Sequence, residues 1–68
     1  MSIMKVIEIL AESEVSWEDA AQKAITEAGE TIDQIHHVYI EHFQGIVENK
    51  KIVKYRVNAK ISFVVKGH

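Results

Sequence analysis

The sequence predicts an α+β fold: a β-α-β-β subunit in which a three-stranded antiparallel sheet is partly wrapped around one helix. Three observations support this prediction. The chain opens with a short aliphatic run, continues with a helical stripe of small apolar residues, and closes with two alternating segments joined by a tight turn. Because the chain has only 68 residues, we expect a single domain that spans residues 1–68.

The first expected strand is the run MKVIEIL, residues 4–10. Ile7 and Ile9 lie on one face of such a strand, and Val6 and Leu10 lie on the other. A strand with apolar groups on both faces is normally covered on both sides. One helix can cover only one face, so the pattern predicts that copies of the chain associate to cover the other.

The expected helix begins after Ser16, a good N-cap residue with Asp19 three positions further on. Gly29 is a typical stop signal. The stripe that would face the sheet consists of Trp17, Ala20, Ala21, Ala24, Ile25 and Ala28. Because most of these side chains are small, the helix can lie close to a sheet, and we interpret Trp17 as a packing residue.

The second half of the chain predicts a β-hairpin whose long last strand is central, with the first two strands antiparallel on either side of it. Asn49 and Lys50 form the expected two-residue turn, because Asn tolerates the left-handed backbone conformation. The register that follows from this turn forms three apolar pairs: Ile46 with Val53, Ile40 with Ala59, and Val38 with Ile61.

The same register assigns the segment QIHHVYIEHF, residues 34–43, to two faces. The residues expected to face the core are Val38, Ile40 and Ile46, with His36 and His42 in line with them. The residues expected on the opposite face are His37, Tyr39, Glu41 and Phe43. On that face Arg56 is expected opposite Phe43, Asn58 opposite Glu41, and Lys60 opposite Tyr39.

Composition argues against several functional classes. The chain has no Cys, so it can form neither a disulfide nor a Cys-based zinc site. Its net charge of -2 provides no field that would attract nucleic acid or an anionic membrane. No apolar run approaches the roughly 18 residues of a membrane span, and no signal-peptide pattern is present. We therefore expect a soluble, cytoplasmic chain with no nucleic-acid or membrane partner.

No catalytic constellation is indicated by the sequence either, and we expect no enzymatic activity. The serines fall in a tail, a turn, a cap and a strand, and the glycines are isolated, so neither a nucleophilic triad nor a phosphate loop is indicated.

No metal site is expected within one chain. His36 and His37 are neighbours in a strand and point to opposite faces, while His36 and His42 lie about 20 Å apart. Two alternatives remain open if symmetry gathers several copies: one histidine from each copy, or carboxylates that bind a hard cation. Those carboxylates are Glu8, Glu12, Glu14 and Glu41. No role is assigned to His68.

Three segments, MKVIEILAESEVSWEDAAQKAI, VENKKIVKYRV and ISF, resemble the dodecins, and the similarity extends over about residues 4–65. The resemblance implies a β-α-β-β subunit whose helix is cradled by an antiparallel sheet. It also implies that twelve subunits form a hollow shell, and that the shell binds and stores flavin without catalysis.

The chain departs from the flavin-binding dodecins at two positions. Those proteins resemble one another in a tryptophan on the second strand, which stacks on the isoalloxazine ring and corresponds here to His37. They also carry a glutamine after an aromatic residue on the last strand, which hydrogen-bonds the pyrimidine edge. Here that pair is Tyr55-Arg56. Imidazole is a smaller and more polar plate than indole, and arginine only donates hydrogen bonds.

The resemblance therefore implies a homododecamer that sequesters a small molecule, with riboflavin or FMN as the ligand. His37 would stack on the ring, Arg56 would make the polar contact, and Tyr39 or Phe43 would form part of the pocket wall. The alternative is a dodecin-like shell that does not bind flavin. Such a shell would be structural, or would bind cations or other anions at its symmetry axes. Family members that are similar in having arginine after that tyrosine are associated with cations.

Overall fold

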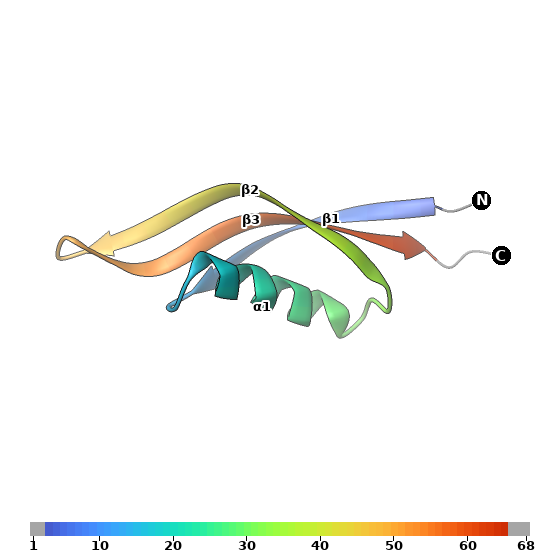
Figure 1. Cartoon of the computed structure of the whole chain (residues 1–68), viewed down its shortest axis with the longest axis horizontal. Helices are drawn as coiled ribbons and strands as arrows, with labels where there is room; N and C mark the ends of the chain where they lie inside the picture. Colours follow the sequence, from blue (N-terminus) through green and yellow to red (C-terminus); the bar gives the residue numbers. More distant parts are fainter. Residues whose placement is uncertain (1–2, 66–68) are drawn as a thin grey trace.

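The computed structural model describes residues 3–65. The elements are β1 (Ile3–Ser13), α1 (Trp17–Gly29), β2 (Ile35–Glu48) and β3 (Lys51–Val65). The strands form one antiparallel sheet in the order β1-β3-β2, and α1 lies along one face of it (Figure 1). The β-α-β-β topology with a central last strand is therefore confirmed. We call the sheet face turned away from α1 the outer face.

The start of α1 has the local structure that its sequence predicts. Ser16 has an extended backbone, and its side-chain oxygen accepts a hydrogen bond from the Asp19 N–H at 2.9 Å. Acidic side chains in the first turn, Glu18 and Asp19, also suit the positive end of the helix dipole. The helix ends at Gly29, the expected stop.

The core lies between α1 and β3. Its buried apolar residues are Ala20, Ala24 and Ala28 from the helix, and Val57, Ala59 and Ile61 from the central strand. Alanine side chains allow the helix to approach the sheet closely. Residues from β1 and β2, among them Ile7, Ile9, Val38 and Ile40, pack around this core. Within residues 3–65 the core is therefore one-sided, and no layer covers the outer face.

The turn between β2 and β3 is the predicted one. Asn49 and Lys50 have φ angles of 53° and 65°, so both residues adopt the left-handed conformation of the tight turns that suit hairpin twist. Glu48 pairs with Lys51 immediately beside the turn. The predicted pairs of Ile40 with Ala59 and Val38 with Ile61 are confirmed.

Between the turn and the pair of Ile40 with Ala59, the register differs from the prediction because the pairing of β2 with β3 is irregular. Between Val47 and Ile46 the register shifts, so Ile46 pairs with Lys54 and not with Val53. A second shift leaves Glu41 without a paired residue in the β2–β3 ladder. Asn58 therefore pairs with His42 rather than Glu41, and Arg56 with Gln44 rather than Phe43. The prediction requires an uninterrupted alternation, whereas each bulge adds one residue to one strand only.

These bulges correct the predicted faces of four residues: His36, His42, Phe43 and Ile46, the last of which pairs with Lys54 and lies on the outer face rather than toward the core. A one-residue slip moves every following side chain to the other face. Phe43 consequently pairs with the buried Val57 and lies on the helix side, while His42 lies on the outer face. His36 falls at a third shift, between Ile35 and His37. His36 and His42 are both exposed, so neither is a core residue.

Candidate functional site

The outer face presents four rows in which side chains from all three strands lie side by side. The rows are Val6–Ser62–His37, Glu8–Lys60–Tyr39, Leu10–Asn58–His42 and Glu12–Arg56–Gln44. Directly paired residues project from the same face of a sheet, so each row is a set of neighbours. The rows combine apolar, aromatic and charged groups.

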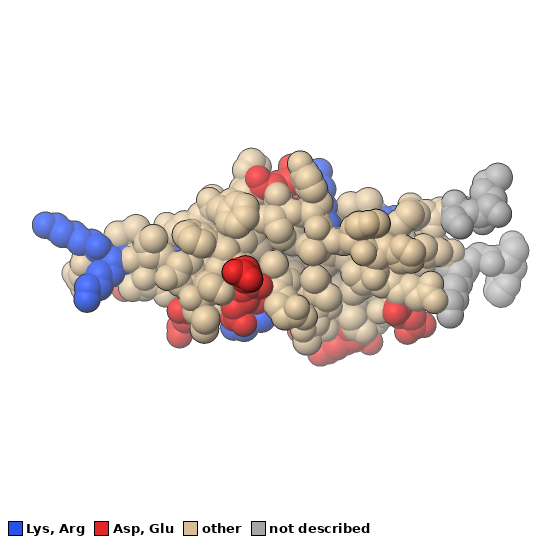
Figure 2. Space-filling view, in the orientation of Figure 1, with Lys and Arg blue, Asp and Glu red and all other residues tan. Residues whose placement is uncertain are grey.

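Large apolar side chains on this face are open to solvent. Met4 is 47% exposed, Val6 60% and Leu10 56%. Such a grouping on a small protein typically marks a surface that binds a partner. In the view of Figure 2, cationic side chains gather at the hairpin tip and acidic ones over the helix. The apolar residues of β1 are therefore surface that this fold alone leaves uncovered.

Arg56 is held by an ion pair with Glu12, its partner across β1 and β3. The Arg56 Nε and Nη2 atoms both donate to Glu12 Oε1, at 2.9 and 2.5 Å. About one third of each side chain remains exposed, 33% and 36%. Such a pair contributes little to stability, but it fixes the guanidinium and neutralises its charge. Gln44 flanks Arg56 on the β2 side.

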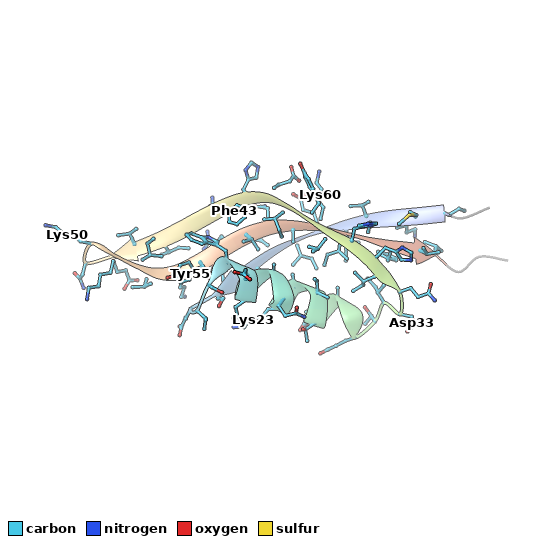
Figure 3. The ribbon with its side chains drawn as sticks, in the orientation of Figure 1. Lys23, Asp33, Phe43, Lys50, Tyr55 and Lys60 are labelled. Carbon is cyan, nitrogen blue, oxygen red and sulfur yellow. The ribbon has the colours of Figure 1, made fainter. Side chains whose placement is uncertain are left out.

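The second ion pair joins β3 to the bulge in β2. Lys60 Nζ lies 2.9 Å from Glu41 Oε1, an atom buried without any well-aligned hydrogen bond to residues 3–65. The short contact with Glu41, and then the Glu41 charge, raise the pKa of Lys60, and Glu8 adds to this. Lys60 points away from α1 in Figure 3. Arg56 and Lys60 on this face are therefore each matched with a carboxylate.

The predicted site residues do not all meet in one chain. His37 pairs with Ser62 and Tyr39 with Lys60, which places both on the outer face, two residues apart. Arg56 is on the same face but six β3 positions from Ser62, about 20 Å along the strand. Phe43 lies on the opposite face, where its ring centroid is 6.0 Å from that of Trp17.

Within residues 3–65, no group of three or more His, Cys, Asp or Glu side chains is placed to hold a metal ion. A hollow of about 360 Å³ at the end of β1 contains Glu12 and Glu14, but Lys23 and Lys54 line it as well. Over the same described part of the chain, no helix is long and apolar enough to cross a membrane.

Sequence reasoning missed two residues near Arg56, namely Gln44 and His42. Both reach the outer face only because Glu41 is bulged out of the ladder. One signal was available in the sequence. Ile40 and Phe43 are apolar residues separated by two polar ones, which breaks the period of two and indicates a bulge.

Comparisons with known proteins agree on one family. The dodecin family model matches residues 3–66. Calcium dodecin from Mycobacterium tuberculosis is 33% identical over 63 residues, which cover 93% of this chain and 89% of that protein. Its crystal structure, described as having a novel calcium-binding site, superposes with a TM-score of 0.83 at 31% identity and covers 96% of this chain and 93% of that one. The dodecin from Streptomyces coelicolor gives a TM-score of 0.91 at 19% identity, with coverage of 98% and 96%, a likeness of fold.

Proposed function

The chain belongs to the dodecin family, and on this basis we propose that it is a non-catalytic, cytoplasmic homododecamer that binds and stores a small molecule, with riboflavin or FMN as the ligand. The main support is the outer face, where exposed apolar residues of β1 adjoin the row of His37 and the row of Tyr39. Burying such surface stabilises association by roughly 25 cal/mol per Å². A ligand bound there would be enclosed between copies.

The proposed flavin site is shared between subunits. The separation of about 20 Å between the rows of His37 and Arg56 exceeds the length of an isoalloxazine ring, so one chain cannot supply both contacts. In the proposed site, His37 stacks on the ring and Tyr39 forms the wall beside it. Arg56 of another copy makes the polar contact. Phe43 can contribute only from a copy whose helix side faces the ligand.

The experiment is an absorbance spectrum of the purified protein, size exclusion with light scattering, and a titration of FMN followed by fluorescence. We expect a particle of twelve subunits that quenches FMN. His37→Ala should abolish quenching and leave the particle intact, whereas His36→Ala, a change at an exposed bulge residue, should preserve both. A monomer, or FMN fluorescence that the protein leaves untouched, would contradict the proposal.

A second candidate function is cation binding, which is supported by the relationship to a calcium dodecin. Glu8 and Glu12 lie on the outer face. Glu41 forms an ion pair with Lys60, which lies on the same face. Ca²⁺ prefers six to eight oxygen ligands, so a site would need carboxylates from several copies around a symmetry axis. Calorimetric titration with Ca²⁺ tests this. A heat of binding to a colourless oligomer, absent in the Glu8→Gln variant, would favour the cation over flavin.

A further inference from the structure

Two side chains on the outer face adjoin Arg56 and have no assigned role. Gln44 lies directly opposite Arg56 across β2 and β3. His42 precedes Gln44 by two residues on the same strand and pairs with Asn58. Alternate residues of a strand share a face and are roughly 7 Å apart. His42, Gln44 and Arg56 are therefore neighbours within one chain, unlike His37 and Arg56.

The hydrogen-bonding capacities of Gln44 and Arg56 are complementary. Arginine carries donors only, and two donor atoms of Arg56 are engaged by Glu12. The pyrimidine edge of a flavin presents an N–H between two carbonyls, so it needs one acceptor and two donors. A glutamine amide supplies one of each. The Gln44 side chain is exposed, and it forms no hydrogen bond to another residue in 3–65.

The backbone of Gln44 is fixed although its side chain is free. The Gln44 carbonyl oxygen accepts the indole N–H of Trp17 at 2.9 Å, from the other side of the sheet. The side-chain amide of Gln44 is therefore attached to a backbone position that is fixed by strand pairing and by this hydrogen bond. A fixed position lowers the ordering cost of binding.

The charge balance around the row indicates the ligand class. Glu12 neutralises Arg56, so the row presents no net charge to a phosphate group. Beside it lie the imidazole of His42 and the side chain of Leu10, which is 56% exposed. A ring wall, an apolar side chain and matched polar groups suit an uncharged planar heterocycle.

We propose that Gln44 and His42 complete the Arg56 half of the ligand site and recognise the imide edge of an uncharged planar ring. Gln44 accepts from the ring N–H and donates to one adjacent carbonyl, Arg56 donates to the other carbonyl, and His42 packs against the ring. The inference rests on the proposed flavin function. In this arrangement Gln44 supplies the acceptor that Arg56 lacks.

The test compares riboflavin with N3-methylriboflavin, which cannot donate from the imide nitrogen. Both are titrated by fluorescence into the oligomer, whose size is followed by light scattering. We expect the methyl group to weaken binding to the unmodified protein about tenfold, the effect of one lost hydrogen bond. Gln44→Ala should weaken riboflavin binding by a similar factor and should bind both ligands equally.

Matched controls separate this role from general effects. Gln22→Ala removes an exposed amide from α1 and should leave both affinities unchanged. Gln44→Glu keeps the acceptor, so it should retain the discrimination against the methylated ligand. His42→Ala should weaken both ligands alike, whereas His36→Ala should weaken neither.

Three results would overturn the inference. If Gln44→Ala binds riboflavin as the unmodified protein does while His37→Ala does not bind, the flavin site stands and the role of Gln44 is wrong. If the methyl penalty persists in Gln44→Ala, another group, such as the carboxylate of Glu12, is the acceptor. If the unmodified protein binds no riboflavin, the proposed function fails, and the inference fails with it.

Discussion

Trp17 donates its indole N–H to the main-chain carbonyl of Gln44 at 2.9 Å, and so joins the first residue of α1 to a strand position 27 residues away. The indole also lies edge-on to Tyr55, with ring centroids 4.8 Å apart at an interplanar angle of 79°. The residue that the sequence assigned to packing is therefore also a polar link between the helix and the edge strand β2.

Trp17→Phe keeps an aromatic ring but removes the indole donor. We expect the free energy of unfolding to fall by about 1 kcal/mol, the net value of one hydrogen bond, with a further loss from the smaller ring. Urea unfolding followed by circular dichroism at several protein concentrations measures this. An unchanged midpoint would mean that the Gln44 carbonyl is equally well satisfied by water.

Lys50→Gly should stabilise the protein. Lys50 has a φ of 65°, a left-handed conformation that costs a non-glycine residue about 1 kcal/mol. We expect thermal unfolding to move to higher temperature by a few degrees. Lys51→Gly, one residue further on in β3, is the matched control and should destabilise, because glycine weakens a strand. Equal effects of the two changes would contradict this explanation.

Asp19 should contribute to the loss of stability in acid. The buried hydroxyl of Ser13 donates to Asp19 Oδ2 at 2.5 Å, and this bond, together with Lys23, lowers the pKa of Asp19 below 3.8 despite partial desolvation. The carboxylate therefore stabilises the fold above pH 3.8, and that contribution is lost as the pH falls through the lowered pKa.

Asp19→Asn should accordingly flatten the decline of the urea midpoint between about pH 5 and about pH 2.5. Asp33→Asn, in the exposed segment after α1, serves as the control for removing a carboxylate at the surface. A decline in Asp19→Asn as steep as in the unmodified protein would show that other groups control acid unfolding.

The double substitution His37→Trp and Arg56→Gln should strengthen flavin binding. Indole offers a larger stacking surface than imidazole, which supplies most of the gain, and a glutamine amide in place of Arg56 keeps a donor for the ring carbonyl. We expect FMN affinity to rise by at least about tenfold, corresponding to roughly 1.4 kcal/mol. Fluorescence titration measures the gain, and the single changes show how it divides. No gain in the double variant would mean that these positions do not meet the ligand in this chain.

Most of the fold could be predicted from local signals. The helix is indicated by Ser16 with Asp19 at its start, the alanine stripe along it and Gly29 at its end. The turn is indicated by Asn49 with Lys50. Each of these signals depends on a few residues close together in the sequence. The bulge at Glu41 could not be placed by counting alternate residues outward from the turn. Bulges depend on how two strands fit over the core, and only the spacing of Ile40 and Phe43 signalled this one.

The candidate site was harder to predict for the same reason. His37 and Tyr39 precede the bulge along β2, in a part where the predicted register holds, and both lie on the outer face as expected. Phe43 follows the bulge and lies on the other side. Sequence position gave no distances, so the separation between His37 and Arg56 became visible only once their partners on β3 were known.

The bulge at Glu41 changes which residue numbers of β2 face outward. Before it, the odd-numbered His37 and Tyr39 face outward; after it, the even-numbered His42 and Gln44 do. Losing Glu41 would remove the bulge and restore the regular alternation of β2, while His42 and Gln44 would keep the outer face and the same partners on β3. Relatives could therefore gain or lose this residue without a change in either binding surface.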